Sequence, residues 1–133
     1  MSSLAPSNGL KNQAAFERLL AERFPAIAAA IDDIERGLLH VEMAVLARAT
    51  CEAIDQGDTR TVCSHLNFID ELFACCAPDL ENAIYVSYLE NVFLGPEDHR
   101  YVIARKLLSD SLQNALTDLE RHWKSITESI KNR

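Results

Sequence analysis

Apolar side chains recur every three or four residues along most of this chain, which is the spacing of one face of an α-helix. The clearest case is the C-terminal third, where successive steps between apolar residues are four, three, four, three and four. This C-terminal seam consists of Leu112, Leu116, Leu119, Trp123, Ile126 and Ile130. A seam of this kind packs along another helix, so we expect Trp123 to lie in the core, with an exposed dimer contact as the alternative.

The same spacing, together with helix-breaking residues, predicts the other helices. Pro25 ends the first one, because the residue before a proline is disfavoured in the α region. Residues 55–58 ("DQGD") and 95–98 ("GPED") are typical of turns, and Asp58 or Thr59 is a suitable N-cap. We expect helices over about residues 10–23, 25–36, 38–54, 59–76, 79–93, 101–108 and 110–130. The prediction is an all-α, single-domain bundle of six or seven helices over residues 9–133, after a disordered tail at residues 1–8.

The stretch "NAIYVSYLENVFLG", residues 82–95, is ambiguous. Its β-branched and aromatic residues suit a strand, whereas Asp79 and Glu81 precede it as acids precede a helix. Strict alternation would leave both faces of a strand mixed, and β-branched residues cost a helix only roughly a few tenths of a kcal/mol each. We therefore predict a helix as far as Phe93, with at least one hydroxyl of Tyr85 and Tyr88 at the surface.

Composition agrees with a helical protein. The chain has 133 residues, of which 48% are hydrophobic, and only four glycines and four prolines, so turns are few. No apolar run approaches the roughly 18 residues that span a bilayer, and the N-terminus lacks the basic and apolar regions of an export signal. We therefore expect a cytoplasmic protein without membrane contact. The four cysteines form no C-x-x-C pair, so we expect reduced, mostly buried thiols, no metal and no cofactor; they are Cys51, Cys63, Cys75 and Cys76.

The net charge of −7 is concentrated in the middle of the chain. Residues 61–99 hold seven acids and no lysine or arginine, whereas the other residues hold 13 acids and 13 cations. The seven acids are Asp70, Glu71, Asp79, Glu81, Glu90, Glu97 and Asp98. A field of one sign repels nucleic acid and attracts a cationic partner. Together with Tyr85 and Tyr88, of a residue type common at interface hot spots, these acids form the predicted partner-binding set. A solvated surface that serves only solubility is the alternative.

Motifs for catalysis are weak in this sequence. His40 and Glu42 form an H-x-E pair as in zinc deaminases, but the P-C-x-x-C that those enzymes need downstream is absent. There is no glycine-rich phosphate loop and no G-x-S-x-G. We predict that the chain is not an enzyme; a small enzyme whose site is assembled by folding is the third interpretation.

The second half of the chain resembles a known group of proteins. "DLENAIYVSYLENVFL", a short turn, a tyrosine and the leucine-rich "LLSDSLQNALTDLERHW" are similar to small acidic helical bacterial proteins, some encoded beside polymorphic toxins, including contact-dependent growth inhibition systems. The matching motif consists of Asn82, Ala83, Ile84, Val86, Ser87, Leu89 and Glu90. The resemblance implies an immunity protein, but it identifies neither the toxin nor a binding residue.

We therefore expect an immunity protein that binds a cognate toxin domain and neutralises it by stoichiometric occlusion. Toxins that cut nucleic acid must hold phosphate, so the expected partner is a nuclease domain with a basic surface. The protein itself is expected to be a monomer or a weak homodimer. The alternative function is a helical adaptor or self-associating protein that uses the C-terminal seam.

Overall fold

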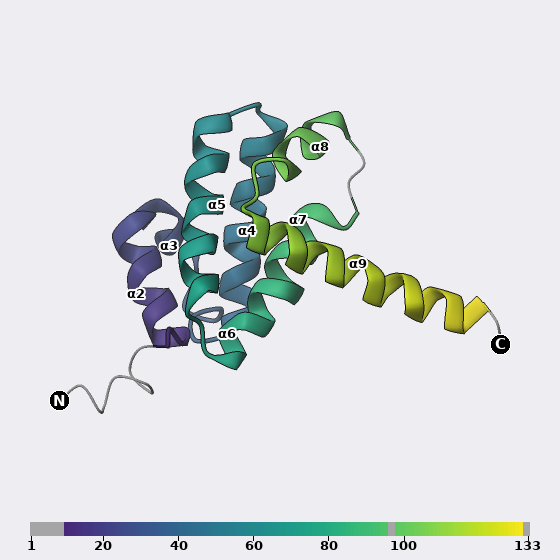
Figure 1. The fold of residues 1–133 in the computed structure, drawn as a ribbon. Coiled ribbons are helices and arrows are strands. Elements are labelled where there is room, and N and C mark those ends of the chain that lie inside the picture. The colour runs from purple at the N-terminus through teal and green to yellow at the C-terminus, as the bar shows by residue number, and fades with distance from the viewer. Residues whose placement is uncertain (1–9, 96–97, 132–133) are drawn as a thin grey trace.

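The computed structural model describes residues 10–95 and 98–131. Figure 1 shows the helices, which are α2 (Gln13–Arg23), α3 (Pro25–Ala30), α4 (Leu39–Asp55), α5 (Thr59–Ala74), α6 (Pro78–Ala83), η2 (Ile84–Leu89), α7 (Glu90–Phe93), α8 (His99–Arg105) and α9 (Asp110–Lys131). Because α6, η2 and α7 are continuous, the described residues form seven helices. The predicted all-α bundle is confirmed, whereas the tail predicted at residues 1–8 lies outside the described residues.

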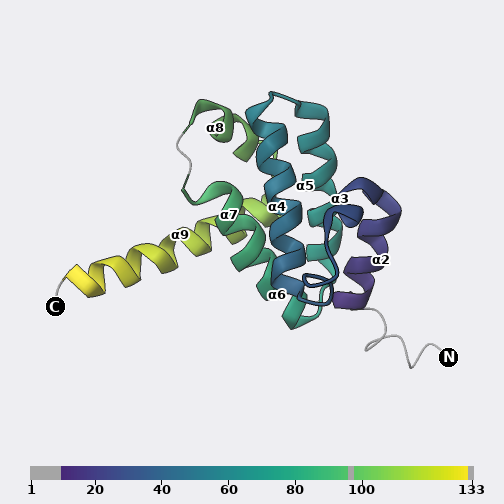
Figure 2. The same cartoon turned by 180° about the vertical axis from the view of Figure 1, so that it is seen from behind.

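Helix α4 is the centre of the bundle, and it packs against α3, α5, α8 and the α6–α7 helix. Helices α2 and α3 lie together on one side (Figure 1). The first half of α9 packs on α5, η2 and α7, and its second half extends away from the bundle in both views (Figures 1 and 2). Within residues 10–95 and 98–131, no helix combines the length and the apolar character that crossing a bilayer requires.

Local signals set most helix boundaries. The Asn12 side chain accepts a hydrogen bond from Ala15 N–H at 3.0 Å, so α2 begins after this cap and later than predicted. Asp58 caps α5 as predicted. Helix α3 ends at Ala30, well short of the predicted residue 36, and Ile34 is 85% exposed rather than part of an apolar face. The chain instead turns at Gly37, whose φ of 91° favours glycine.

The segment that is ambiguous in sequence is helical from Pro78 to Phe93, as predicted. Its middle turn, η2, is π-helical, a wide turn that adds one residue to a helix. In a regular helix, the buried row through Ile84 would continue to Asn91, which is exposed. The added residue turns Val92 and Phe93 inward instead. The mixed apolar pattern of residues 82–95 therefore arises from two buried helical rows, one before and one after the π-helical turn, which are offset by one residue.

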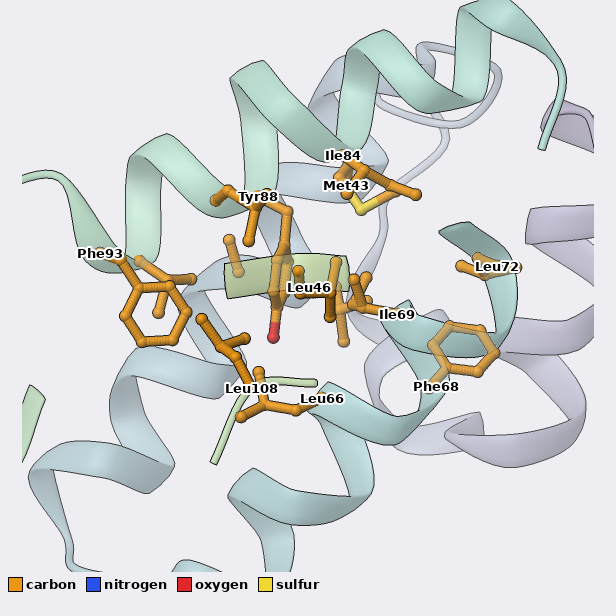
Figure 3. Close-up of a cluster of buried hydrophobic side chains, with 14 of the residues drawn as sticks. Met43, Leu46, Leu66, Phe68, Ile69, Leu72, Ile84, Tyr88, Phe93 and Leu108 are labelled. Atoms are coloured by element: carbon orange, nitrogen blue, oxygen red, sulfur yellow. The ribbon is translucent and has the colours of Figure 1, made fainter. Parts of the chain in front are cut away.

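The core gathers side chains from most of the helices. Figure 3 shows Tyr88 among Leu46, Leu66, Ile69 and Leu108, and Tyr88 is fully buried. Burial of this many apolar side chains is the main stabilising term of the fold. The cysteines differ from expectation, because Cys51, Cys63 and Cys76 are half-buried and Cys75 is exposed.

Candidate protein-binding surface

Three acids of the predicted partner-binding set contact another helix or cap a helix, and a fourth, Asp79, accepts the N–H of its neighbour Leu80 at 2.8 Å. Ser109 Oγ donates a hydrogen bond to Asp70 Oδ1 at 2.6 Å, and Arg23 Nη2 lies 2.7 Å from Glu71 Oε2. Asp98 caps α8 by accepting a backbone N–H of its first turn at 2.8 Å. Of these contacts, the one between Arg23 and Glu71 brings a cation to a block that has none in the sequence. These three carboxylates serve internal contacts and do not form one free acidic face.

Other acids meet around Tyr85. Burial raises the pKa of the Tyr85 phenol, and the nearby carboxylates of Glu81 on α6 and Asp118 on α9 raise it further. Both carboxylates belong to exposed residues, as does Asp79 in the first turn of α6. The Tyr85 ring packs edge-on against Phe73, with centroids 5.7 Å apart. We define the acidic surface as Asp79, Glu81, Tyr85 and Asp118.

A cation also reaches the acidic surface. Arg121 Nη1 lies 3.8 Å from Asp118 Oδ1 on the next turn of α9. Side-chain exposures of 79% for Arg121 and 66% for Asp118 mean that water screens this pair, which contributes little to stability. A cationic partner can therefore displace Arg121 at small cost.

Glu90 lies further along the α6–α7 helix, beside the point where α9 leaves the bundle. It lines a groove with Asn91, Leu94 and Trp123. Trp123 is 44% exposed, so the prediction that it lies in the core is wrong. The seam is buried only as far as Leu119, because α9 extends away from the bundle beyond this point (Figures 1 and 2). Glu97, the remaining acid of the predicted set, lies outside the described residues.

Tyr88 does not belong to a binding surface, which corrects its place in the predicted set. Its hydroxyl lies 2.8 Å from Thr50 Oγ1, and His65 Nδ1 lies 2.9 Å from the same oxygen. Thr50 donates its own hydrogen to the Leu46 carbonyl oxygen, so it accepts from both Tyr88 and His65. Burial raises the pKa of Tyr88 and lowers that of His65, so both groups are neutral. The network joins α4, α5 and η2 inside the core and is sealed from any substrate.

The H-x-E pair seen in the sequence does not converge on one site. His40 Nδ1 lies 2.7 Å from Ser87 Oγ on η2, whereas Glu42 Oε2 accepts the Gly37 N–H at 3.0 Å. Within the described residues, no three His, Cys, Asp or Glu side chains come together as a metal site would require. The contact of His40 with Ser87 instead ties α4 to η2.

Glu42 is a buried carboxyl with incomplete hydrogen bonding. It is 1% exposed, and its Oε1 has no hydrogen-bond partner among the described residues. Burial, followed by the neighbouring carboxyl of Glu17, raises the pKa of Glu42. The folded protein therefore keeps this proton to a higher pH than the unfolded chain does. Stability conferred by the protonated form is complete below the ordinary glutamate pKa and is lost as pH rises through the raised folded value.

We expect Glu42→Gln to stabilise the fold at neutral pH, because the amide keeps the contact with Gly37 and removes a buried charge. The advantage over the parent disappears at low pH, where Glu42 is protonated. Glu42→Ala, by contrast, removes the acceptor of the Gly37 N–H, and since Gly37 is exposed we expect a cost of about 1 kcal/mol. Urea unfolding of the three proteins across the acid range measures these differences. A Gln variant whose advantage does not change with pH contradicts the assignment.

Sequence reasoning missed two parts of this region. Asp118 lies outside the acidic block in the sequence, and only the packing of α9 on η2 brings it to Tyr85. The exposure of Trp123 and Ile130 was also missed, although a run of polar residues around them in the last three turns of the chain is a weak signal of solvent on most sides.

The fold and its surfaces define a single-domain, all-α helical bundle from which one long helix projects. A family model described as "Domain of unknown function (DUF7674)" matches residues 17–124, and the chain belongs to this family. Neither the curated proteins nor the solved structures gave a match.

Proposed function

We propose that this chain is an immunity protein, which binds a cognate toxin domain through the acidic surface and blocks it by occlusion. The observation that carries the proposal is the packing of α9 on η2, which brings Asp118 near Tyr85 and Glu81 although it is distant from them in sequence. Because Tyr85 is half-buried against Phe73, its ring offers apolar contact area at a low cost in conformational entropy.

The acidic surface suits a partner that holds phosphate. The active site of a nuclease carries cations that neutralise the nucleic-acid backbone. Carboxylates at this surface can form ion pairs with those cations in place of phosphate. The Tyr85 ring adds an apolar contact that excludes water. Attraction over several ångströms also speeds association, and salt weakens it. No chemistry by the bound protein is needed for such inhibition.

The experiment begins with the neighbouring gene. The proposal expects a large secreted protein with a variable C-terminal domain to be encoded immediately upstream. Expression of that C-terminal domain alone is expected to arrest cells, and co-expression of this chain is expected to rescue them and to yield a one-to-one complex on purification. A neighbouring domain that neither binds this chain nor is neutralised by it would sink the proposal.

Charge reversal tests the surface itself. The double substitution Glu81→Lys with Asp118→Lys is expected to weaken toxin binding about tenfold to a hundredfold, mainly through the association rate. The matched control is Glu22→Lys with Asp33→Lys, two exposed acids remote from Tyr85 that bring the same change in net charge. Surface plasmon resonance at two salt concentrations separates the association and dissociation rates. Equal effects of the two double variants would show that only the overall charge matters.

A further inference from the structure

The outer half of α9, residues 120–131, carries apolar side chains that the bundle does not cover. Trp123 is 44% exposed, Ile130 is 67% exposed, and Ile126 is partly buried. These three residues continue the face that Leu116 and Leu119 bury in the core. Figures 1 and 2 show this half of the helix extending away from the other helices. An apolar face on a projecting helix is therefore unpartnered in the single chain.

An ion pair joins α9 to α8 at the start of the outer half. Arg105 on α8 contacts both carboxylate oxygens of Glu120, at 2.8 and 2.5 Å. This contact raises the pKa of Arg105 and lowers that of Glu120, so both groups stay charged. A two-point contact of this geometry fixes direction as well as distance. It adds a contact between α8 and α9 at the turn where α9 leaves the bundle, and the outer half continues from there as part of the same helix.

The residues beside the apolar face do not oppose self-association. Ser129 and Thr127, which are uncharged, flank the face together with His122. The charged residues Arg121, Lys124 and Glu128 lie further round the helix. Two copies of this face can therefore meet without like charges directly opposite each other.

Charge also favours one direction of pairing. Lys131 lies at the C-terminal end of α9, which is the tip of the projecting helix. Glu90, on α7, lies in the groove with Leu94 and Trp123, beside the base of the outer half, where α9 leaves the bundle. In an antiparallel pair, the tip of each helix reaches the base of the other, so Lys131 of one copy approaches Glu90 of the second. A parallel pair would bring the like-charged tips together instead.

We propose that the outer halves of α9 from two copies of this chain pair antiparallel, centred on Ile126. Trp123 lies three residues before Ile126 and Ile130 lies four residues after it, or about 4.5 and 6 Å along the helix. Trp123 of each copy therefore packs beside Ile130 of the other, and this isoleucine fills the groove at the base of α9. The contact is short compared with a standard interface, so the dimer is weak and dissociates on dilution.

The test is sedimentation equilibrium of the full chain over a wide range of concentration. We expect a monomer–dimer equilibrium that Trp123→Asp or Ile130→Asp shifts by at least about tenfold toward monomer. The matched control is Val102→Asp on α8, an exposed apolar residue outside α9, which leaves the equilibrium unchanged. Because all three residues are at least 44% exposed, the variants are expected to fold, and circular dichroism checks this.

A charge exchange tests the direction. Glu90→Lys alone and Lys131→Glu alone are each expected to weaken the dimer, and the two together are expected to restore it. A chain that is monomeric at every concentration, or a dimer that the α9 variants leave intact, overturns the proposal. A double variant that dimerises more weakly than either single variant also overturns it. The proposal does not depend on toxin binding, because Glu81→Lys with Asp118→Lys is expected to leave the dimer unchanged.

Discussion

Tyr88→Ala is expected to destabilise the fold by about 3–5 kcal/mol, the range for removing a large aromatic side chain from a core. The ring is fully buried, and its hydroxyl bonds to Thr50. Its loss leaves a cavity at the junction of α4, α5 and η2 and removes a donor from a buried network. Urea unfolding followed by circular dichroism measures the change in the free energy of unfolding.

Two variants separate the parts of this effect. Tyr88→Phe keeps the ring and removes only the hydroxyl, so we expect a loss of about 1 kcal/mol. Tyr85→Ala removes the same type of residue from a half-buried position and is expected to cost clearly less than Tyr88→Ala. If the two alanine variants are equally destabilised, the assignment of one tyrosine to the core and the other to the surface is wrong.

Leu116→Ala is expected to destabilise the fold by about 2–5 kcal/mol, whereas Ile130→Ala on the same face of the same helix is expected to change stability by less than about 0.5 kcal/mol. Leu116 is fully buried, and Ile130 is 67% exposed. The comparison is made by urea unfolding at a protein concentration low enough for the chain to be monomeric, because a dimer would add its own stabilisation.

The outcome distinguishes two views of α9. A large difference between the two variants shows that only the first half of the helix belongs to the cooperative core. A loss at Ile130 as large as that at Leu116, in the monomer, would mean that the outer half folds back on the bundle. In that case the apolar face would not be available to a second copy.

Most of the fold could be predicted from the sequence, because its determinants are local. Pro25 ends a helix through its own backbone geometry, and Asp58 caps α5 through a hydrogen bond to Thr61, three residues away. The helix over residues 79–93 was also predicted, but its π-helical turn was not. That turn decides that Val92 and Phe93, and not Asn91, face the core, and a regular period of 3.6 residues does not predict it.

The candidate surface was predictable only in part. Glu81 and Tyr85 were in the predicted set and lie near each other, and Asp79, also in that set, is exposed in the first turn of α6. Asp70 and Glu71 were in it as well, but they meet partners that lie far away along the chain. Arg23 is 48 residues from Glu71, and Ser109 is 39 residues from Asp70. Charge counted along the chain does not reveal such long-range contacts.

The sequence by itself determined that this chain forms helices, where most of them begin and end, and which face of each is apolar. Backbone geometry, capping and periodicity act within a few residues, so they can be recognised in short stretches of the sequence. Only the tertiary structure decided which apolar positions are covered and which acids remain unpaired. Leu116 and Ile130 occupy equivalent positions of one seam, but one faces the bundle and the other faces water. That difference depends on where the neighbouring helices end in space, which no local pattern specifies.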